Sequence, residues 1–334
     1  MESTARQFDR PLVSVVTPTF NQAEFLRDTL ESVLTQDYPN IEYLVLDDGS
    51  TDETPGILSE YTGRLEWESQ ANMGQTPTIN KGWERSHGDI ITWLNSDDTF
   101  LPGAVGKAVN YFQQHPNIDI VFGDSLFTSA DGSPIEPSKP QAGFDYSGFV
   151  AECHNPIPQP SAFIRRSVIE NIGLLDPGYY YFMDWDFWLR AGLDHSIAYF
   201  PELLSTYRLH EASKTVAQAV KAAPELEYMY RKFFALPNLR EEIRCLEREA
   251  MMNMFFTSAE YYLQGGSRRA ARRMAIKTLQ TYPGAFLRPV VVHKFLYCFL
   301  ADRPLYQGSR DTYYRAREIL RNLGRTDLVS PKEG

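Results

Sequence analysis

Short apolar runs alternate with helical patterns along the first hundred residues of the chain. Leu12–Thr17 and Ile41–Leu46 are β-branched or apolar runs without polar alternation, which is typical of strands buried on both faces of a parallel sheet. We expect Pro18 to end the first strand. A helix is expected between the two strands, because apolar residues recur there at helical spacing: Phe25, Leu26, Leu30, Val33 and Leu34.

The same alternation continues as far as residue 94. Ser50 and Glu53 form a capping-box pattern for a short helix. A strand at 65–68, a helix at about 78–86 and a strand at 90–94 follow. This βαβαβαβ order predicts an α/β fold with a mostly parallel central sheet flanked by helices and connected by right-handed crossovers. Ligands of such sheets bind beyond the carboxyl ends of the strands.

From residue 225 onward the pattern is helical. We expect one domain over 1–216 and a helical C-terminal extension over 217–334. Composition agrees with a globular protein, since the 334 residues are 43% hydrophobic and 23% charged. Three widely spaced cysteines predict buried free thiols in a reducing compartment. No signal peptide or membrane span is recognisable, so we expect a cytoplasmic protein.

Charge is divided unevenly along the chain. Residues 1–263 carry 19 Lys and Arg against 38 Asp and Glu, whereas residues 264–334 carry 14 against 5. The acidic body argues against a nucleic-acid partner. The basic segment with its apolar runs would allow peripheral contact with an anionic membrane at the inner face. The alternative is a helical bundle that packs on the acidic body or forms a dimer.

Polar residues follow three of the predicted strands. They are Pro18 to Asn21, Asp47 to Ser50, and Asn95 to Asp98. The carboxyl ends of parallel strands share one edge, so two acidic clusters should converge there. A divalent cation with a phosphorylated ligand would offset this charge, and oxygen ligands favour Mg²⁺ or Mn²⁺. Taken alone, the DDGS tip is more typical of a turn or a helix cap than of a chemical site, but the conjunction of three such tips favours a site.

Four segments of the sequence carry a family resemblance. VSVVTPTFN, LVLDDGSTDET, NMGQTPTINKGW and GDIITWLNSDDTFLPGAV resemble, in order and spacing, the N-terminal half of family 2 glycosyltransferases with the GT-A fold. The resemblance covers about residues 11–213. It implies an inverting transfer of a sugar from a nucleotide diphosphate sugar, in the first instance a UDP-sugar, to a hydroxyl of a glycan or lipid-linked acceptor. Polysaccharide or cell-envelope biosynthesis is the implied setting.

The resemblance also implies roles for single residues. Pro18, Thr19 and Asp48 would hold the base and ribose. Asn72, Gly74 and Asn80 would shape the flanking loop, although the two asparagines could equally be caps. Asn95 stands where the family's DxD motif has its first Asp. The cation would be bound by Asp97, with Asp98 in support and His210 in reach, while Arg208 would bind phosphate or an acidic residue.

A second acidic segment resembles the part of the family that carries the catalytic base. Asp184 matches the base that deprotonates the acceptor hydroxyl, and Met183 stands where Glu is common. Asp186 could compete for that role, cap the helix or pair with Arg190 four residues later. The neighbouring aromatic residues favour core packing over an acceptor platform. Gln159 and Ser161, in a Pro-rich segment, are candidates for donor-sugar or acceptor contacts.

Two alternatives remain open at this stage. Asn95 and Met183 both replace acidic residues, so the chain could be a catalytically degenerate protein that binds sugar nucleotides. A nucleotidyltransferase is the weaker alternative, because the segment after the first strand has neither glycine nor a basic residue before Arg27. Product formation distinguishes an enzyme from a protein that only binds sugar nucleotides.

Overall fold

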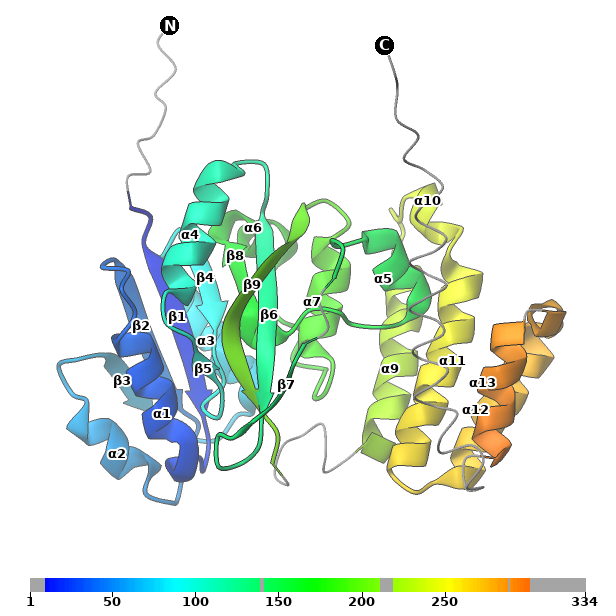
Figure 1. The fold of residues 1–334 in the computed structure, drawn as a ribbon, viewed down its shortest axis with the longest axis horizontal. Helices are drawn as coiled ribbons and strands as arrows, with labels where there is room; N and C mark the ends of the chain where they lie inside the picture. Colours follow the sequence, from blue (N-terminus) through cyan, green and yellow to red (C-terminus); the bar gives the residue numbers. More distant parts are fainter. Residues whose placement is uncertain (1–9, 139–140, 211–218, 288, 301–334) are drawn as a thin grey trace, which may run out of the picture. The chain divides into compact units, whose positions relative to one another are not determined.

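The computed structural model describes residues 10–138, 141–210, 219–287 and 289–300 (Figure 1). The chain divides into two compact units, residues 1–254 and 255–334. The expected boundary at 216/217 falls outside the described residues and stays a prediction. Unit 1 is an α/β unit and unit 2 is helical, which agrees with the predicted fold class.

One mixed sheet organises unit 1. Among the described residues its order is β3-β2-β1-β4-β8-β6-β9-β5, with β7 beside β6. The first four strands in that order are parallel: β3 (Glu66–Ser69), β2 (Ile41–Asp47), β1 (Val13–Thr19) and β4 (Ile90–Trp93). The others are β8 (Ala162–Arg165), β6 (Ile120–Thr128), β9 (Ile197–Arg208), β5 (Thr99–Phe100) and β7 (Pro134–Pro137). β8 is antiparallel to both β4 and β6.

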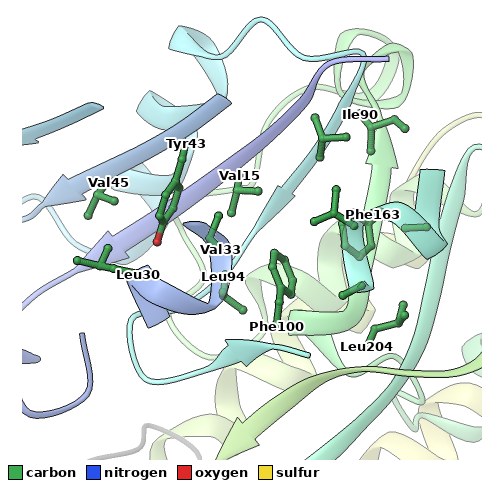
Figure 2. Close-up of a cluster of buried hydrophobic side chains, with 14 of the residues drawn as sticks. Val15, Leu30, Val33, Tyr43, Val45, Ile90, Leu94, Phe100, Phe163 and Leu204 are labelled. Atoms are coloured by element: carbon green, nitrogen blue, oxygen red, sulfur yellow. The ribbon is translucent and has the colours of Figure 1, made fainter. Parts of the chain in front are cut away.

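Helices cover both faces of the parallel part. On one face, α1 (Ala23–Leu34), α2 (Thr54–Glu60) and α4 (Ala104–Gln114) contribute apolar residues to one core cluster with the strands, in which α4 contacts β6 and β9. Figure 2 shows Leu30 and Val33 of α1 against the strand residues Val15, Tyr43 and Val45. The apolar residues that recur at helical spacing in α1 therefore form part of this core.

The opposite face is covered by α3 (Gln75–Arg85), which approaches β1 very closely. A Cβ atom on Gly82 would lie 2.3 Å from Cγ1 of Val16. Beyond this contact an aromatic cluster begins, in which the rings of Trp83 and Trp93 lie 5.4 Å apart and those of Trp93 and Trp188 lie 5.9 Å apart. Gly82 thus sets the distance between helix and sheet.

Several elements complete unit 1. They are α5 (Tyr146–Glu152), the 3₁₀ turn η1 (Gln159–Ser161), α6 (Arg166–Ile172), α7 (Met183–Ala191), α9 (Ala219–Phe234) and α10 (Glu241–Arg244). The helix α11 (Glu247–Gln264) begins in unit 1 and ends in unit 2, which continues with α12 (Arg268–Thr281), η2 (Pro283–Leu287) and α13 (Pro289–Leu300). Across the described residues, every helix is too short or too polar to cross a bilayer.

Three local expectations need correction. β1 continues through Pro18 to Thr19, because the backbone N–H that proline lacks is not needed for the pairing of Thr19 with Asp47. α2 begins at Thr54, not Ser50, and Asp52 accepts the Thr54 N–H there. Cys245 is exposed, whereas Cys153 and Cys298 are buried as expected.

The contact at Gly82 yields a stability prediction. Gly82→Ala should lower the free energy of unfolding by about 1–3 kcal/mol, since the added methyl overlaps a buried valine. Gly56→Ala in α2 is the matched control, because a Cβ there meets open space, and it should be neutral or stabilising by up to about 1 kcal/mol. Urea unfolding of both variants measures the difference. Equal stability of the two variants would contradict the close approach.

Candidate active site

The tips of β1, β2 and β3 lie level at one edge of the sheet. Thr19 pairs with Asp47, and Asp47 pairs with Ser69. β4 ends beside Val16 of β1, so Asn95 follows at the same edge. The register therefore brings together the polar tips that the strand pattern predicted.

Asp48 fixes the loop after β3. Its Oδ1 accepts hydrogen bonds from Gln70 Nε2 at 3.1 Å and from Met73 N at 2.9 Å, and its Oδ2 accepts one from Gly74 N at 2.8 Å. Gly74 has φ +94°, which favours glycine. Beside Asp48, Thr19 is 2% exposed and its hydroxyl has no hydrogen-bond partner within the described part of the chain. A buried hydroxyl without a partner is suited to bind a ligand.

Asn95 lies between two glutamine side chains. Its Oδ1 accepts from Gln75 Nε2 at 2.8 Å, and its Nδ2 donates to Gln159 Oε1 at 3.0 Å. The structure brings Gln159 to the DxD-like loop, and its expected contact with the donor sugar or the acceptor stays a prediction. The Ser161 hydroxyl is buried and donates to the Gly123 carbonyl, which is a role inside the fold.

Asp97 and His210 meet although 113 residues separate them. His210 Nε2 lies 3.0 Å from Asp97 Oδ2, and the His210 side chain is 6% exposed. Two donor atoms at one point fit a Mg²⁺ or Mn²⁺ ion that takes its other ligands from phosphate and water. Among the described residues, no group of three or more His, Cys, Asp or Glu side chains surrounds a common point. The described part of the protein therefore offers only these two side-chain ligands at this point.

Asp98 and Arg208 hold this loop from behind. Asp98 Oδ1 accepts the Arg208 backbone N–H at 2.9 Å, and burial, followed by the charge of Asp97, raises the pKa of Asp98 well above its usual range. The Arg208 guanidinium donates to Asp28 and to the carbonyls of Asp97 and Ala130. Of the two expected roles for Arg208, these bonds match contact with an acidic residue.

Asp184 is partly buried in the first turn of α7. Burial raises its pKa to about 6, although the N–H groups of the helix start and Asn155 Nδ2, 3.4 Å away, oppose that rise. A carboxyl with a pKa close to neutral is suited to act as a general base. Asn155 belongs to the Pro-rich segment, but sequence reasoning did not single it out.

Glu225 of α9 fixes the backbone in front of α7. Its carboxylate accepts N–H groups from Tyr180, Tyr181 and Phe182 at 2.9, 2.6 and 2.8 Å. Its negative charge also adds to the rise in the pKa of Asp184. Nothing in the sequence marked Glu225, because its partners are backbone groups more than forty positions earlier.

The remaining candidates have structural partners. Asp186 accepts from Arg190 Nε at 2.8 Å, as the i, i+4 alternative predicted. The Asn80 amide bonds to both backbone groups of Leu175, so its expected nucleotide contact stays a prediction. Met183 is buried, and its sulfur accepts a hydrogen bond from the Thr76 hydroxyl. The nearby aromatic residues are mostly buried as expected, whereas Tyr180 is 50% exposed.

Comparisons with known proteins bear on the family and the fold of this chain. Residues 14–173 match the sequence family described as "Glycosyl transferase family 2". The chain carries a family 2 glycosyltransferase domain. An uncharacterized glycosyltransferase of Rickettsia prowazekii is 26% identical over 84% of this chain and 89% of the relative.

Solved structures support the GT-A fold of this glycosyltransferase. S. aureus TarS 1–349 in complex with UDP-GlcNAc superposes with a TM-score of 0.58 at 16% identity, over 91% of this chain and 92% of TarS 1–349. The mannosyltransferase PcManGT of Pyrobaculum calidifontis, in complex with GDP-Man and Mn²⁺, superposes with a TM-score of 0.56 at 16% identity, over 87% and 86% of the two chains.

Proposed function

We propose that this glycosyltransferase transfers a sugar from a UDP-sugar to a hydroxyl of a glycan or lipid-linked acceptor, with inversion at the anomeric carbon. The observation that carries the proposal is the position of Asp184 in the first turn of α7 beside Asn155, where burial raises its pKa to about 6. The start of α7, which carries Asp184, contacts the start of α3 through Met183 and Thr76. The adjacent Gln75 of α3 contacts Asn95 at the sheet edge.

The chemistry follows from having one carboxylate available as a base. Asp184 takes the proton of the acceptor hydroxyl while that oxygen attacks the anomeric carbon and the bond to the diphosphate breaks. A double displacement would need a second carboxylate as nucleophile. Two other carboxylates of this region are engaged, since Asp186 binds Arg190 and Glu225 binds three backbone N–H groups. Single displacement with inversion is therefore the favoured course.

Two observations support a UDP-sugar donor: the polar groups at the sheet edge and the similarity in fold to TarS 1–349. Thr19 and Asp48 provide a hydroxyl and a carboxylate at the sheet edge for the base and ribose. The fragment TarS 1–349 in its UDP-GlcNAc complex is similar in fold over 92% of its length. Asp97 and His210 would hold Mg²⁺ or Mn²⁺, which when bound would offset the charge that develops on the departing diphosphate. A catalytically degenerate binding protein remains the alternative, and product formation decides between the two.

The role of Asp184 can be tested by its pH dependence. The carboxylate form is the base, so kcat/KM should fall as the pH falls through about 6. Asp184→Asn should lower turnover by at least about 10³-fold and leave UDP binding nearly unchanged. The same variant should raise the thermal midpoint at pH 7.5, because a buried charge is removed. A variant with near-normal turnover would exclude Asp184 as the base.

Glu225→Gln provides the matched control for this assignment. It keeps one acceptor oxygen, which can serve the Tyr181 and Phe182 N–H groups, gives up the acceptor of the Tyr180 N–H, and removes the negative charge that adds to the rise in the pKa of Asp184. The midpoint of the acidic limb should therefore move to lower pH. An unchanged midpoint would show that the charge of Glu225 does not raise the pKa of the group that controls the limb.

The metal proposal is tested by titrating UDP with and without Mn²⁺. Mn²⁺ should raise the affinity of the wild type, and Asp97→Ala should lose that increase, because one of the two protein ligands is removed. Asp37→Ala, which removes the same charge beyond the end of α1, should keep it. A Mn²⁺ effect that survives Asp97→Ala would place the ion elsewhere.

Peripheral membrane contact is a separate proposal about unit 2. On α12, Ala271, Ala275 and Thr278 are buried, whereas the exposed face carries four arginines together with Ile276 and Leu279. The helix has no acidic residue. Such a basic and apolar face complements an anionic bilayer surface.

Vesicle co-sedimentation of the full chain tests this contact. The protein should bind phosphatidylserine-containing vesicles at low salt and not purely neutral ones. Arg269→Gln with Arg273→Gln should weaken binding about 30-fold, at about 1 kcal/mol for each charge. Arg27→Gln with Arg64→Gln removes the same charge from unit 1 and should have little effect. Equal binding by both double variants would refute the contact through α12.

A further inference from the structure

Three side-chain amides form a hydrogen-bonded chain behind the DxD-like loop. Gln159 Nε2 donates to the backbone carbonyl of Trp93 at 2.7 Å. Asn95 Nδ2 donates to Gln159 Oε1 at 3.0 Å, and Gln75 Nε2 donates to Asn95 Oδ1 at 2.8 Å. Gln159 is 8% exposed, so its hydrogen bonds are made away from bulk water. The chain links η1, the loop after β4 and the start of α3.

A backbone carbonyl fixes the direction of all three amides. Because the Trp93 oxygen can only accept, Gln159 must turn its NH₂ group toward it. The Gln159 oxygen then faces Asn95, which must donate to it from its own NH₂ group. The Asn95 oxygen in turn faces the NH₂ group of Gln75. No other assignment of the amide oxygens and nitrogens satisfies each contact.

The side chain at position 95 must therefore donate a hydrogen bond to Gln159. One N–H of Asn95 Nδ2 is used by Gln159 Oε1, and Asp98 Oδ2 lies 3.4 Å from the same nitrogen. An ionised aspartate has no proton to donate, so it would face an amide oxygen and a carboxylate. The buried Gln159 oxygen would also lose its partner, which typically costs about 1–3 kcal/mol.

We propose that Asn95 and Gln159 are a matched pair of positioning residues, in which Gln159 requires a hydrogen-bond donor at position 95 and so favours asparagine over aspartate. Asn95 is then no remnant of a lost aspartate. It orients the loop that carries Asp97 and leaves the diphosphate site with one negative charge fewer. The part of this proposal that concerns catalysis rests on the proposed function, whereas the coupling between the two side chains does not.

A double-mutant cycle tests the pair. Asn95→Asp restores the residue that the family motif has, yet it should lower both the thermal midpoint of the ligand-free protein and kcat/KM, the latter by at least about tenfold. Gln159→Met keeps the shape of the side chain but removes the oxygen that faces position 95. In that background, Asn95→Asp should cost less than about threefold, because the nearer opposed oxygen is gone and only Asp98 Oδ2, at 3.4 Å in the wild type, still faces position 95.

Gln75→Met is the control for the cycle. Gln75 donates to the oxygen of Asn95, and aspartate has an oxygen in the same place. Asn95→Asp should therefore cost as much in the Gln75→Met background as in the wild type. This contrast separates the polarity of the chain from general damage to the loop.

The outcomes are distinguishable from failure of the proposed function. An Asn95→Asp protein as stable and as active as the wild type would overturn the pairing. So would an equal cost of Asn95→Asp in the wild-type and Gln159→Met backgrounds. If the wild type forms no product with any UDP-sugar, the proposed function fails, and the thermal midpoints of the same variants still decide whether the pair is coupled.

Discussion

The acidic loop at residues 95–98 is held by a part of the chain more than a hundred residues later. β5 follows this loop directly and pairs antiparallel with β9, so Phe100 lies opposite Ser205. That pairing places the buried Arg208 behind the loop, where its backbone N–H binds Asp98 and its guanidinium binds the Asp97 carbonyl. Clustered carboxylates are stable only with such compensation. The contact between His210 and Asp97 depends on the same pairing.

Burial gives the acidic residues of the site different properties. Asp98 lies deep beside another carboxylate, and the pKa of its carboxyl is raised far above the usual range. Asp184 is less deeply placed and its pKa rises to about 6, which leaves it ionised at neutral pH and still basic enough to accept a proton. Asp48 binds three donors of one loop and shapes that loop. These aspartates thus differ in role because their surroundings differ.

The two departures from the family pattern have partners inside the fold. Asn95 belongs to an amide chain whose direction is set by a backbone carbonyl. Met183 is buried and its sulfur receives the hydroxyl of Thr76. A residue drifting after loss of function has no reason to acquire such complementary neighbours. Both departures are therefore compatible with an active glycosyltransferase.

Local pattern was sufficient to predict the parallel half of the sheet, its first helices and the shared edge of Thr19, Asp48 and Asn95, because these depend on short-range periodicity and on the rule for parallel strands. The resemblance singled out Asp97, His210 and Asp184 by motif. Tertiary structure alone decided that Glu225 binds the backbone before α7, that Gln159 faces Asn95, and that the amide of Asn80 is used by Leu175. These contacts join a side chain to residues or backbone groups more than forty positions away, and backbone groups leave no signal in the sequence.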